Sequence, residues 1–398
     1  MIFFITFILA IFVIYLWADF HFGRKRHLAT FQKRQHPIRN SDITLFTQGG
    51  ELFEDFFAEI QKAKHHIHIL FFIVKKDTVS KRFFEALMEK AQAGVEVKLL
   101  LDRVGSHKVP KDMQTQLKLA GVEFFYCNKM KPPFFFYTSQ VRNHRKITVI
   151  DGKIGYMGGF NIGKEYIDMS PKLTPWRDYH LKFAGEGVRD LQHEFLIDWQ
   201  MATNQNLLPE KTYFPELSPG AVRHQLVPTE GILLEDYFSE LIQNAQKTIF
   251  IGTPYFIPSS KVFQDLIEAI NRGVQVKILI PQKRDHLFVK EASFRYLRPL
   301  LKKGAKVYQF VNGFYHAKIL IIDEEFCDIG TANFDKRSFF LNLEMNCYIF
   351  NQPFLKEVEQ VVHKDLGDAR LLAVDALDQP SLFIRVKEMI ARPISYFL

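Results

Sequence analysis

NHRKITVID at residues 143–151 recurs as YHAKILIID at residues 315–323, and this pair of stretches decides the fold of the chain. Three other pairs of segments precede them, in the same order in the two halves of the sequence. They are IQKAKHHIHI (60–69) with IQNAQKTIFI (242–251), FFEALMEKAQAGVEVKLLLD (83–102) with FQDLIEAINRGVQVKILIP (263–281), and AGVEFFYC (120–127) with KGAKVYQF (303–310). Because these segments match in one order, the sequence predicts a single structural unit used twice.

Each unit alternates helices with strands. An amphipathic helix, with apolar residues three and four positions apart, ends near Gly94 in the first unit and Gly273 in the second. A strand rich in Val, Leu and Ile follows in both. This alternation is typical of β-α-β units, so we predict an α/β fold whose sheet is covered by helices on both faces. The polar stretch TNQNLL at 203–208 marks the join and divides the body into residues 41–205 and 206–375.

The repeated stretches carry side chains that suit chemistry at a phosphate. In each unit a histidine and a lysine stand two residues apart, and in a strand both would project from the same face. An apolar strand follows and ends at an aspartate, and an asparagine lies ten residues further on. A lone pair of this kind is usually an exposed strand face, but two copies in register indicate a site. The residues are His144, Lys146, Asp151 and Asn161 in the first unit, and His316, Lys318, Asp323 and Asn333 in the second.

This spacing, His-x-Lys-x(4)-Asp followed by a glycine-rich segment and Asn, resembles the signature of the phospholipase D superfamily. RNHRKITVIDGKIGYMGGFNIGKEY, PWRDYHLKFAGEGV, TPYFIPS and GTANFDKRSFFLNLEMN are similar, more narrowly, to segments of bacterial cardiolipin synthases, and the matches cover most of residues 40–375. The resemblance implies two α/β halves, each with a mixed sheet, that meet at one shared active site. It also implies a membrane-bound enzyme that transfers a phosphatidyl group from one phosphatidylglycerol to another, releasing glycerol.

The residue types fit this chemistry. A neutral imidazole can attack a phosphodiester phosphorus to give a phosphohistidine, while a protonated imidazole protonates the departing alkoxide. Following the family, we expect His144 to be the nucleophile and His316 the acid and base, although the sequence itself does not separate them. Lysine and asparagine side chains would neutralise the phosphoryl oxygens, so we expect neither a metal nor another cofactor. The expected phosphate ligands are Lys146, Lys318, Asn161, Asn333 and the hydroxyl of Thr331, whereas Gly159 offers only its backbone N–H.

Carboxylates complete the expected site. The family places a carboxylate downstream of each motif to orient its histidine, and the candidates are Asp178 in the first unit and Glu344 in the second. Surface salt bridges are the alternative for both. Asp151 and Asp323 belong to the catalytic motif, but their position at the end of a strand favours a structural role on backbone groups.

Other functions stay open on the sequence alone. With water as acceptor the same residues would make a phospholipase D, and with another alcohol they would make a different phospholipid. The motif also serves nucleases and other phosphodiesterases, and the net charge of +8 would permit nucleic-acid binding. An apolar N-terminus, an aromatic loop and the lack of a nucleic-acid recognition motif favour anionic phospholipid as the partner. A non-catalytic lipid-binding protein would be expected to have lost a motif residue, and both motifs are complete.

Residues 1–18, MIFFITFILAIFVIYLWA, contain no charged side chain and as a helix would span about 27 Å, close to the thickness of a bilayer core. A cleaved signal peptide would have a basic start and a small-residue cleavage site, which this run lacks. Basic residues follow instead, in the segment 19–40, which we expect to be a juxtamembrane linker. The positive-inside rule then predicts a single-pass protein whose body lies on the cytoplasmic side. The resemblance implies that the membrane is that of a bacterial cell and that the body is the catalytic domain. A buried apolar helix and an interfacial segment are the alternatives.

Two other segments are expected at the membrane surface. MKPPFFFYT at 130–138 holds four successive aromatic residues that cannot all point inward from an extended segment, which favours a lip on the bilayer over a core turn. The tail 376–398 is amphipathic, and its part LFIRVKEMIARPISYFL (382–398) would form a short interfacial helix or pack onto the body. Basic residues that flank the lip would meet anionic headgroups: Lys129, Lys131, Arg142 and Arg145.

Two sets of potential metal ligands carry little weight. A histidine cluster has no carboxylate or cysteine at ligand spacing, so we expect no metal there; it consists of His65, His66 and His68. The cysteines lie far apart, which indicates neither a disulfide framework nor a zinc site; they are Cys127, Cys327 and Cys347.

Overall fold

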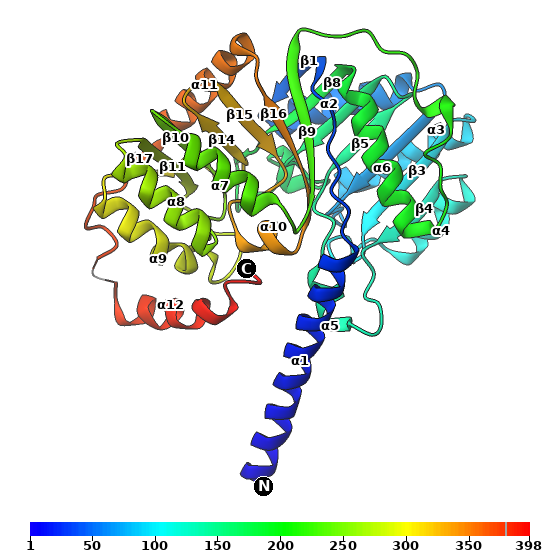
Figure 1. The fold of residues 1–398 in the computed structure, drawn as a ribbon. Coiled ribbons are helices and arrows are strands. Elements are labelled where there is room, and N and C mark those ends of the chain that lie inside the picture. The colour runs from blue at the N-terminus through cyan, green and yellow to red at the C-terminus, as the bar shows by residue number, and fades with distance from the viewer. Residues whose placement is uncertain (379) are drawn as a thin grey trace.

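The computed structural model describes residues 1–378 and 380–398, and shows two similar halves beside a long N-terminal helix, α1 (Ile2–Thr30) (Figure 1). The first half contains β1 (Arg39–Phe46), α2 (Gly49–Lys62), β2 (His66–Phe71), α3 (Thr78–Gln92), β3 (Glu96–Asp102), α4 (Lys111–Leu119), β4 (Glu123–Cys127), α5 (Phe135–Gln140), β5 (Ile147–Ile150), β6 (Ile154–Gly158), the 3-10 helix η1 (Lys164–Ile167), β7 (Trp176–Arg177), β8 (His180–Gly185) and α6 (Gly187–Thr203). After η2 (Lys211–Tyr213), the second half contains β9 (Val222–Glu230), α7 (Leu234–Asn244), β10 (Thr248–Gly252), α8 (Ser260–Asn271), β11 (Gln275–Pro281), α9 (Val289–Lys302), β12 (Lys306–Phe310), β13 (Phe314–Tyr315), β14 (Ile319–Ile322), β15 (Phe326–Gly330), α10 (Lys336–Phe340), β16 (Leu343–Ile349), α11 (Gln352–Gly367), β17 (Ala369–Leu371) and α12 (Leu382–Ile394).

One continuous sheet runs through both halves of the described chain, in the order β17-β12-β11-β10-β14-β15-β16-β9-β1-β8-β6-β5-β2-β3-β4. β9 and β1 pair antiparallel at its centre, and the strands on either side of them repeat in mirror order. The β-α-β units give parallel pairs, β2 with β3 and β4, and β10 with β11 and β12. The strands between these units and the centre are antiparallel. The predicted α/β class with two related halves is therefore confirmed, and the sheet is mixed.

Local sequence signals set the ends of the repeated helices. The side chain of Asp77 accepts a hydrogen bond from Ser80 N at the start of α3, and Ser259 does the same for Val262 N at the start of α8. Past the C-terminal ends of these helices, Gly94 and Gly273 have φ values of +89° and +93°, a backbone region in which a side chain would be strained. The helix ends that the two glycines predict are therefore confirmed.

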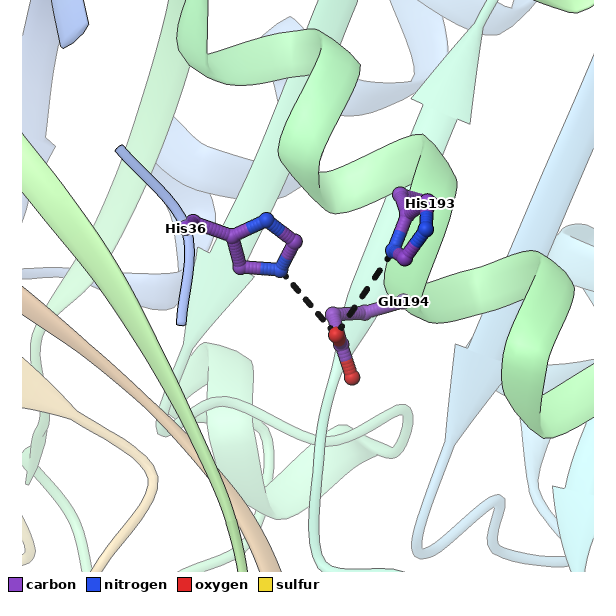
Figure 2. A group of neighbouring side chains, drawn as sticks. All are labelled: His36, His193 and Glu194. Carbon is purple, nitrogen blue, oxygen red and sulfur yellow. Dashed lines mark hydrogen bonds and ion pairs between the residues drawn. The ribbon is translucent and has the colours of Figure 1, made fainter. Parts of the chain in front are cut away.

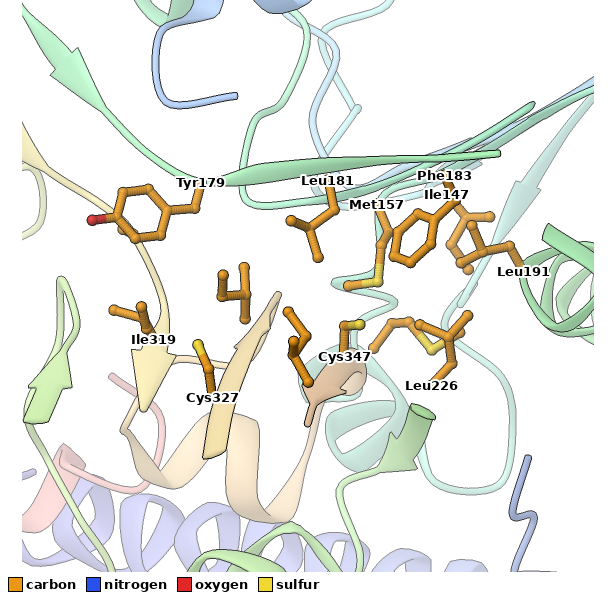
Figure 3. Packing of buried hydrophobic residues seen from close by; sticks show 14 of the residues in the cluster. Ile147, Met157, Tyr179, Leu181, Phe183, Leu191, Leu226, Ile319, Cys327 and Cys347 are labelled. Atoms are coloured by element: carbon orange, nitrogen blue, oxygen red, sulfur yellow. The ribbon is translucent and has the colours of Figure 1, made fainter. Parts of the chain in front are cut away.

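The two halves are joined by an apolar core. Figure 3 shows Leu181 and Phe183 of β8 facing Cys327 and Cys347, which come from β15 and β16 of the other half. These side chains are buried, and so are the inward faces of α6 and α11 beside them. Removing this much apolar surface from water holds the halves together as one body, without a disulfide among the three cysteines.

α1 continues beyond the expected membrane span. It does not end at Ala18 but remains helical through the basic segment to Thr30, so the first part of the linker expected at 19–40 continues the same helix. The reason is packing, because α1 contacts α5 here: Tyr137 N donates to Asp19 Oδ1 at 2.8 Å, and a Cβ at Gly23 would lie 2.6 Å from Cβ of Tyr137. Among the described residues, Phe3–Thr30 is the helix that is long and apolar enough to cross a membrane.

The aromatic loop is helical rather than extended. In α5 the ring of Tyr137 turns toward α1 and is buried, while Met130 and Phe135 stay about half exposed. Only part of the predicted lip is therefore free to touch lipid.

Two of the basic residues expected to meet headgroups point inward instead, which corrects that prediction. Arg142 donates to the carbonyl oxygens of Asn128 and Thr138. Arg145 is fully buried and forms an ion pair with Asp198 at 3.0 Å.

One buried acid gives a testable consequence for stability. Asp328 on β15 is fully buried, and this burial raises its pKa to about 8 although Asn346 Nδ2 donates to it at 2.6 Å. Because the pKa is raised on folding, its favourable contribution is complete at low pH and is lost as the pH rises toward 8. Asp328→Asn should therefore raise the thermal unfolding midpoint at pH 8, and the difference from the unsubstituted protein should close near pH 4. An equal difference at both pH values would contradict this.

Candidate active site

Backbone pairing between the halves places both His-x-Lys segments. His144 N donates to the carbonyl of Leu343 at 2.9 Å, and His316 N donates to the carbonyl of Arg177 at 2.7 Å. The two lysines, with the histidines, precede β5 and β14 rather than lying within them, so the prediction that they occupy a strand is wrong. The segments are diverted because each crosses to pair with the opposite half before its own strand begins.

This crossing exchanges the orienting carboxylates. Nδ1 of His144 is 2.9 Å from Glu344 Oε2, and Nδ1 of His316 is 2.5 Å from Asp178 Oδ2. The sequence prediction found both carboxylates but gave one to each half, whereas each serves the histidine of the other half. Both carboxylates are fully buried, so neither is a surface ion-pair partner. Since Nδ1 faces a carboxylate in both cases, Nε2 is the nitrogen left to react.

Glu344 is held by several donors besides His144. Thr331 Oγ1 donates to its Oε2 at 2.6 Å, and Ser338 Oγ and Asn342 Nδ2 donate to its Oε1 at 2.9 and 3.2 Å. Thr331 Oγ1 also accepts from Met345 N at 2.9 Å. Its hydroxyl is thus already engaged, which corrects the prediction that it binds phosphate: Thr331 positions the carboxylate instead.

Asp178 sits in a different setting. Its Oδ1 accepts a hydrogen bond only from the N–H of Tyr179, at 2.8 Å. Its Oδ2 contacts Nδ1 of His316 and forms an ion pair with Lys318 Nζ at 3.7 Å. A Cβ on Gly159 would lie 1.9 Å from Asp178 Oδ1, so this position has no room for a side chain. The N–H of Gly159 donates to the carbonyl of Tyr179, so it too is engaged rather than free for phosphate.

The two lysines are buried beside the histidines. Lys146 Nζ donates to the carbonyl of His144 at 2.6 Å, and Lys318 Nζ lies 2.7 Å from His316 Nδ1. Burial lowers the pKa of Lys146 to about 7 and that of Lys318 to about 8, although Glu344 and Asp178 act in the opposite direction on each. A negatively charged phosphate that binds beside these buried lysines would raise their pKa values and so favour their protonated forms.

The electrostatic coupling crosses the interface as well. Burial lowers the pKa of His144 to about 4, Glu344 opposes this, and both Lys146 and Lys318 add to the lowering. Burial and Lys318 also lower the pKa of His316, while Asp178 raises it. The pKa of Glu344 is lowered, because His144 and Lys146 outweigh its burial. The two motifs thus form one site.

The remaining motif residues divide into two groups. Asn161 and Asn333 are buried. Oδ1 of Asn161 accepts Ile73 N at 3.0 Å and its side chain also hydrogen-bonds to Tyr166, whereas Oδ1 of Asn333 has no hydrogen-bond partner. Asp151 and Asp323 instead cap turns at the far ends of β5 and β14. Each accepts three backbone N–H groups, from Lys64, His65 and His66 and from Gln246, Lys247 and Thr248 respectively. Both aspartates stabilise the strand ends, and neither contacts His144 or His316.

Aromatic rings that the sequence analysis did not single out border the histidines. The ring centroid of Phe72 lies 4.9 Å from that of His144, and the centroid of Trp176 lies 4.8 Å from that of His316. Tyr255 stands 6.3 Å from His316 and donates through its hydroxyl to Asp285. Phe72 directly follows β2, whereas Tyr255 lies three residues past the end of β10. In the register of the repeat Phe72 corresponds to Pro254, so the repeat itself gave no signal for these rings.

The altered pKa values predict how activity depends on pH. A reaction that needs neutral His144 and protonated Lys146 and Lys318 in the free enzyme should have a kcat/KM that falls below about pH 4 and again above about pH 7 to 8. Because the pKa of His316 is lowered, a need for its protonated form as well would move the upper fall to lower pH. The measurement is kcat/KM in neutral detergent micelles, where no surface charge shifts the local pH. A profile that is flat from pH 6 to pH 9 would exclude the lysines as the titrating groups.

A second group of potential ligands lies outside this site, where the chain enters the body (Figure 2). His36 Nε2 is 3.0 Å from Glu194 Oε1, and His193 Nδ1 is 3.8 Å from the same oxygen. Arg34 and Arg145 also pair with Glu194, at 3.2 and 3.3 Å. Two guanidinium groups on one carboxylate oppose the approach of a cation. We therefore regard the group as an ion-pair network that fastens the segment after α1 to α6.

Known proteins resemble the chain over nearly its whole length. The family model described as cardiolipin synthase, phospholipase D-like domain, matches residues 56–171 and 238–366. The minor cardiolipin synthase ClsB of Bacillus subtilis (strain 168) is 41% identical over 394 residues, which covers 99% of this chain and 98% of the relative. The major cardiolipin synthase ClsA of the same organism is 38% identical over 373 residues, or 91% of this chain and 77% of that one.

A solved structure agrees with this at the level of the fold. The phosphatidylserine synthase of Haemophilus influenzae Rd KW20 superposes with a TM-score of 0.70 at 16% identity, covering 94% of this chain and 100% of that chain. Together with the duplicated motif and the family match, the comparisons establish a phosphatidyltransferase with the duplicated phospholipase D fold. The chain belongs to the cardiolipin synthase family of the phospholipase D superfamily.

Proposed function

We propose that the protein makes cardiolipin by moving a phosphatidyl group from one phosphatidylglycerol to the primary hydroxyl of another. The observation that carries the proposal is the pair of buried histidines, each held at Nδ1 by a carboxylate from the opposite half. Two imidazoles with free Nε2 atoms suit a double displacement, in which one nitrogen bonds to phosphorus while the other moves protons. Relatives named cardiolipin synthases support the choice of lipid.

In the first step, Nε2 of His144 attacks the phosphorus of the donor lipid. The bond from phosphorus to the glycerol oxygen breaks, and the imidazolium of His316 gives its Nε2 proton to the departing alkoxide, which leaves as glycerol. The phosphatidyl group is then attached to His144. Lys146, Lys318 and the amide of Asn161 face the non-bridging oxygens, whose charge grows in the transition state. The donor's own negative charge helps His316 to hold its proton in this buried site.

In the second step, the acceptor lipid enters the place that glycerol vacated. Neutral His316 takes the proton of its primary hydroxyl, the oxygen bonds to phosphorus, and the bond from phosphorus to His144 breaks. Both histidines return to their starting states, so the reaction needs no net proton and no redox partner. The overall change in free energy is small, because the reaction replaces one phosphodiester bond with another.

The unequal settings of the two carboxylates support this assignment of roles. Three side-chain donors besides His144 share the negative charge of Glu344, so His144 is the less basic imidazole and suits the nucleophile. Asp178 has a single backbone donor beside His316 and Lys318, and Asp285 adds a further negative charge nearby. His316 is thus the better holder of a proton.

We further propose that α1 anchors the enzyme as a single span in a bacterial cell membrane and that the body lies in the cytoplasm. The dense run of exposed apolar residues in α1 ends at Trp17, and beyond it only Phe22 and Leu28 are exposed large apolar residues of this helix. Arg24, Lys25 and Arg26 lie in this second part, where the helix reaches the body. This distribution agrees with the positive-inside rule.

The experiment is product analysis by mass spectrometry, using the purified full-length protein in phosphatidylglycerol vesicles with EDTA present. Cardiolipin and glycerol in equal amounts, absent with His144→Ala, would support the transferase and show that no divalent ion is needed. Phosphatidic acid as the main product would mean that water is the acceptor and that the protein acts as a phospholipase D. Products that form only without EDTA would overturn the metal-free mechanism.

A further inference from the structure

The C-terminal helix α12 presents an apolar stripe to the outside. Leu382, Phe383 and Met389 are 79%, 68% and 69% exposed, values that few large apolar side chains reach on a soluble surface. Val386 and Ile390 extend the stripe at spacings of three and four residues, so these side chains share one helix face. An isolated exposed leucine needs no explanation, but a continuous stripe along a helix does.

The other face of α12 is fixed to the body, so the stripe cannot turn inward. Arg298 of α9 pairs with Glu388, and Glu291 of the same helix pairs with Lys387 at 3.3 Å. Between these contacts, Ala391 is fully buried against the core of the second half. The sequence analysis left open whether this helix packs onto the body or lies at the membrane surface. One face of α12 does pack onto the body, and the apolar face is uncovered.

The end of α12 is also tied to the base of the membrane helix. The rings of Tyr396 and Phe397 lie 5.6 and 5.4 Å from that of Phe20, which follows the exposed apolar part of α1. Figure 1 shows α12 and α5 at the same end of the body from which α1 extends, with α12 lying across the direction of α1. A helix that lies across a membrane span, at the level where the span leaves the body, is parallel to the bilayer surface.

We propose that α12 and the exposed part of the α5 loop form a second membrane contact, which docks into the headgroup region of an anionic phospholipid bilayer. The proposal rests on the membrane-bound function proposed above. Met130 and Phe135 supply the apolar contribution of the loop. Exposed cations surround both parts and match the negative charge of the lipid: Lys129, Lys131, Arg385 and Arg392, together with Lys25 and Arg26 of α1.

This contact sets the height and tilt of the active site over the lipid. Arg337 of α10 donates to the carbonyls of Gln140, in α5, and Phe397, in the tail. The next residue, Ser338, donates to Glu344, which orients His144. The docking surface is thus one residue removed from the groups that hold the catalytic carboxylate. With α1 as the only membrane contact, the body could rotate and tilt relative to the bilayer. A second contact fixes its orientation, with the active site over the lipid headgroups.

The test uses full-length protein with a cysteine introduced at Met389, labelled with an environment-sensitive fluorophore. The native cysteines are buried and should not react. The matched control is Lys356→Cys, an exposed site on α11, a helix that Figure 1 shows at the end of the body away from α1 and α12. In phosphatidylglycerol vesicles that contain lipids with a headgroup nitroxide, the label at 389 should shift to the blue and be quenched, and the label at 356 should do neither. Solvent-like emission from 389, with the protein still floating with the vesicles, would overturn the proposal. A blue shift without quenching would also overturn it, since a second protein copy would then cover the stripe.

A second pair of measurements separates docking from chemistry. Phe383→Glu with Met389→Glu should lower the rate on vesicle phosphatidylglycerol severalfold and leave the rate on a monomeric short-chain phosphatidylglycerol unchanged. Equal vesicle rates for the variant and the unsubstituted protein would overturn the docking role while leaving the proposed function in place. Loss of the proposed function itself would instead appear as the absence of cardiolipin with both substrates.

Discussion

His144→Ala is expected to abolish cardiolipin formation, lowering kcat by about 10⁴-fold or more, because no other group near the phosphorus can take the place of the nucleophilic nitrogen. The imidazole is about nine-tenths buried and its removal leaves a small cavity, so the protein should stay folded and bound to vesicles. The measurement is single-turnover product formation by mass spectrometry. His65→Ala is the matched control, because that side chain is exposed and Asp151 uses only the residue's backbone N–H. Turnover by His144→Ala above a small percentage would end the two-histidine mechanism.

A donor with an activated leaving group assigns the roles of the two histidines. p-Nitrophenolate departs without a proton, so phosphatidyl-p-nitrophenol does not need the general acid. His316→Ala should therefore release one nitrophenolate per enzyme molecule and retain a phosphatidyl group on His144, which intact-mass analysis would detect. His144→Ala should release none. If the two variants behaved the other way round, the nucleophile would be His316.

The second large effect is on stability. Arg145→Met should destabilise the protein by about 3–5 kcal/mol, because removing one partner of a buried ion pair leaves the others unpaired in the interior. The guanidinium is fully buried and contacts Asp198 at 3.0 Å, Glu194 at 3.3 Å and the carbonyl of Glu344 at 3.0 Å. It therefore joins α6 of the first half to β16 of the second.

The measurement is the urea midpoint of the detergent-solubilised protein, compared with that of Arg370→Met. Arg370 lies exposed on β17, so its loss should change the free energy of unfolding by less than about 0.5 kcal/mol. Similar midpoints for the two variants would show that Arg145 is not a structural centre. Because Arg145 holds the backbone of Glu344, its variant should also lose activity at temperatures where it is still folded.

The sequence predicted most of the fold because duplication doubles every local signal. The helix ends at Gly94 and Gly273 and the strands that end at Asp151 and Asp323 were each indicated twice, so chance resemblance could be discounted. What the sequence could not predict concerns tertiary packing. The continuation of α1 past Ala18 could not be deduced locally, because it depends on a partner in α5 more than a hundred residues away. The burial of Arg142 depends on the turn around Asn128, whose shape the sequence does not specify.

The candidate site divides along the same line. His144, Lys146, His316 and Lys318 were identified by spacing, and the structure brings them together. The pairing of carboxylates with histidines was not predictable, since it follows from backbone hydrogen bonds between the halves at Leu343 and Arg177. The engagement of Thr331 by Glu344 was hidden for the same reason: a hydroxyl beside a phosphate motif looks like a ligand until its neighbour across the strand is known.

The exchange of carboxylates also constrains how such a protein can evolve. A harmful substitution of Glu344 impairs the histidine encoded in the first half of the gene. A harmful substitution of Asp178 impairs the histidine encoded in the second half. Neither copy of the ancestral duplication can therefore drift toward a separate substrate, or decay, without disabling the other. If the polypeptide were cut between Thr203 and Val222, two inert fragments would result, and only their reassociation could restore a working catalyst.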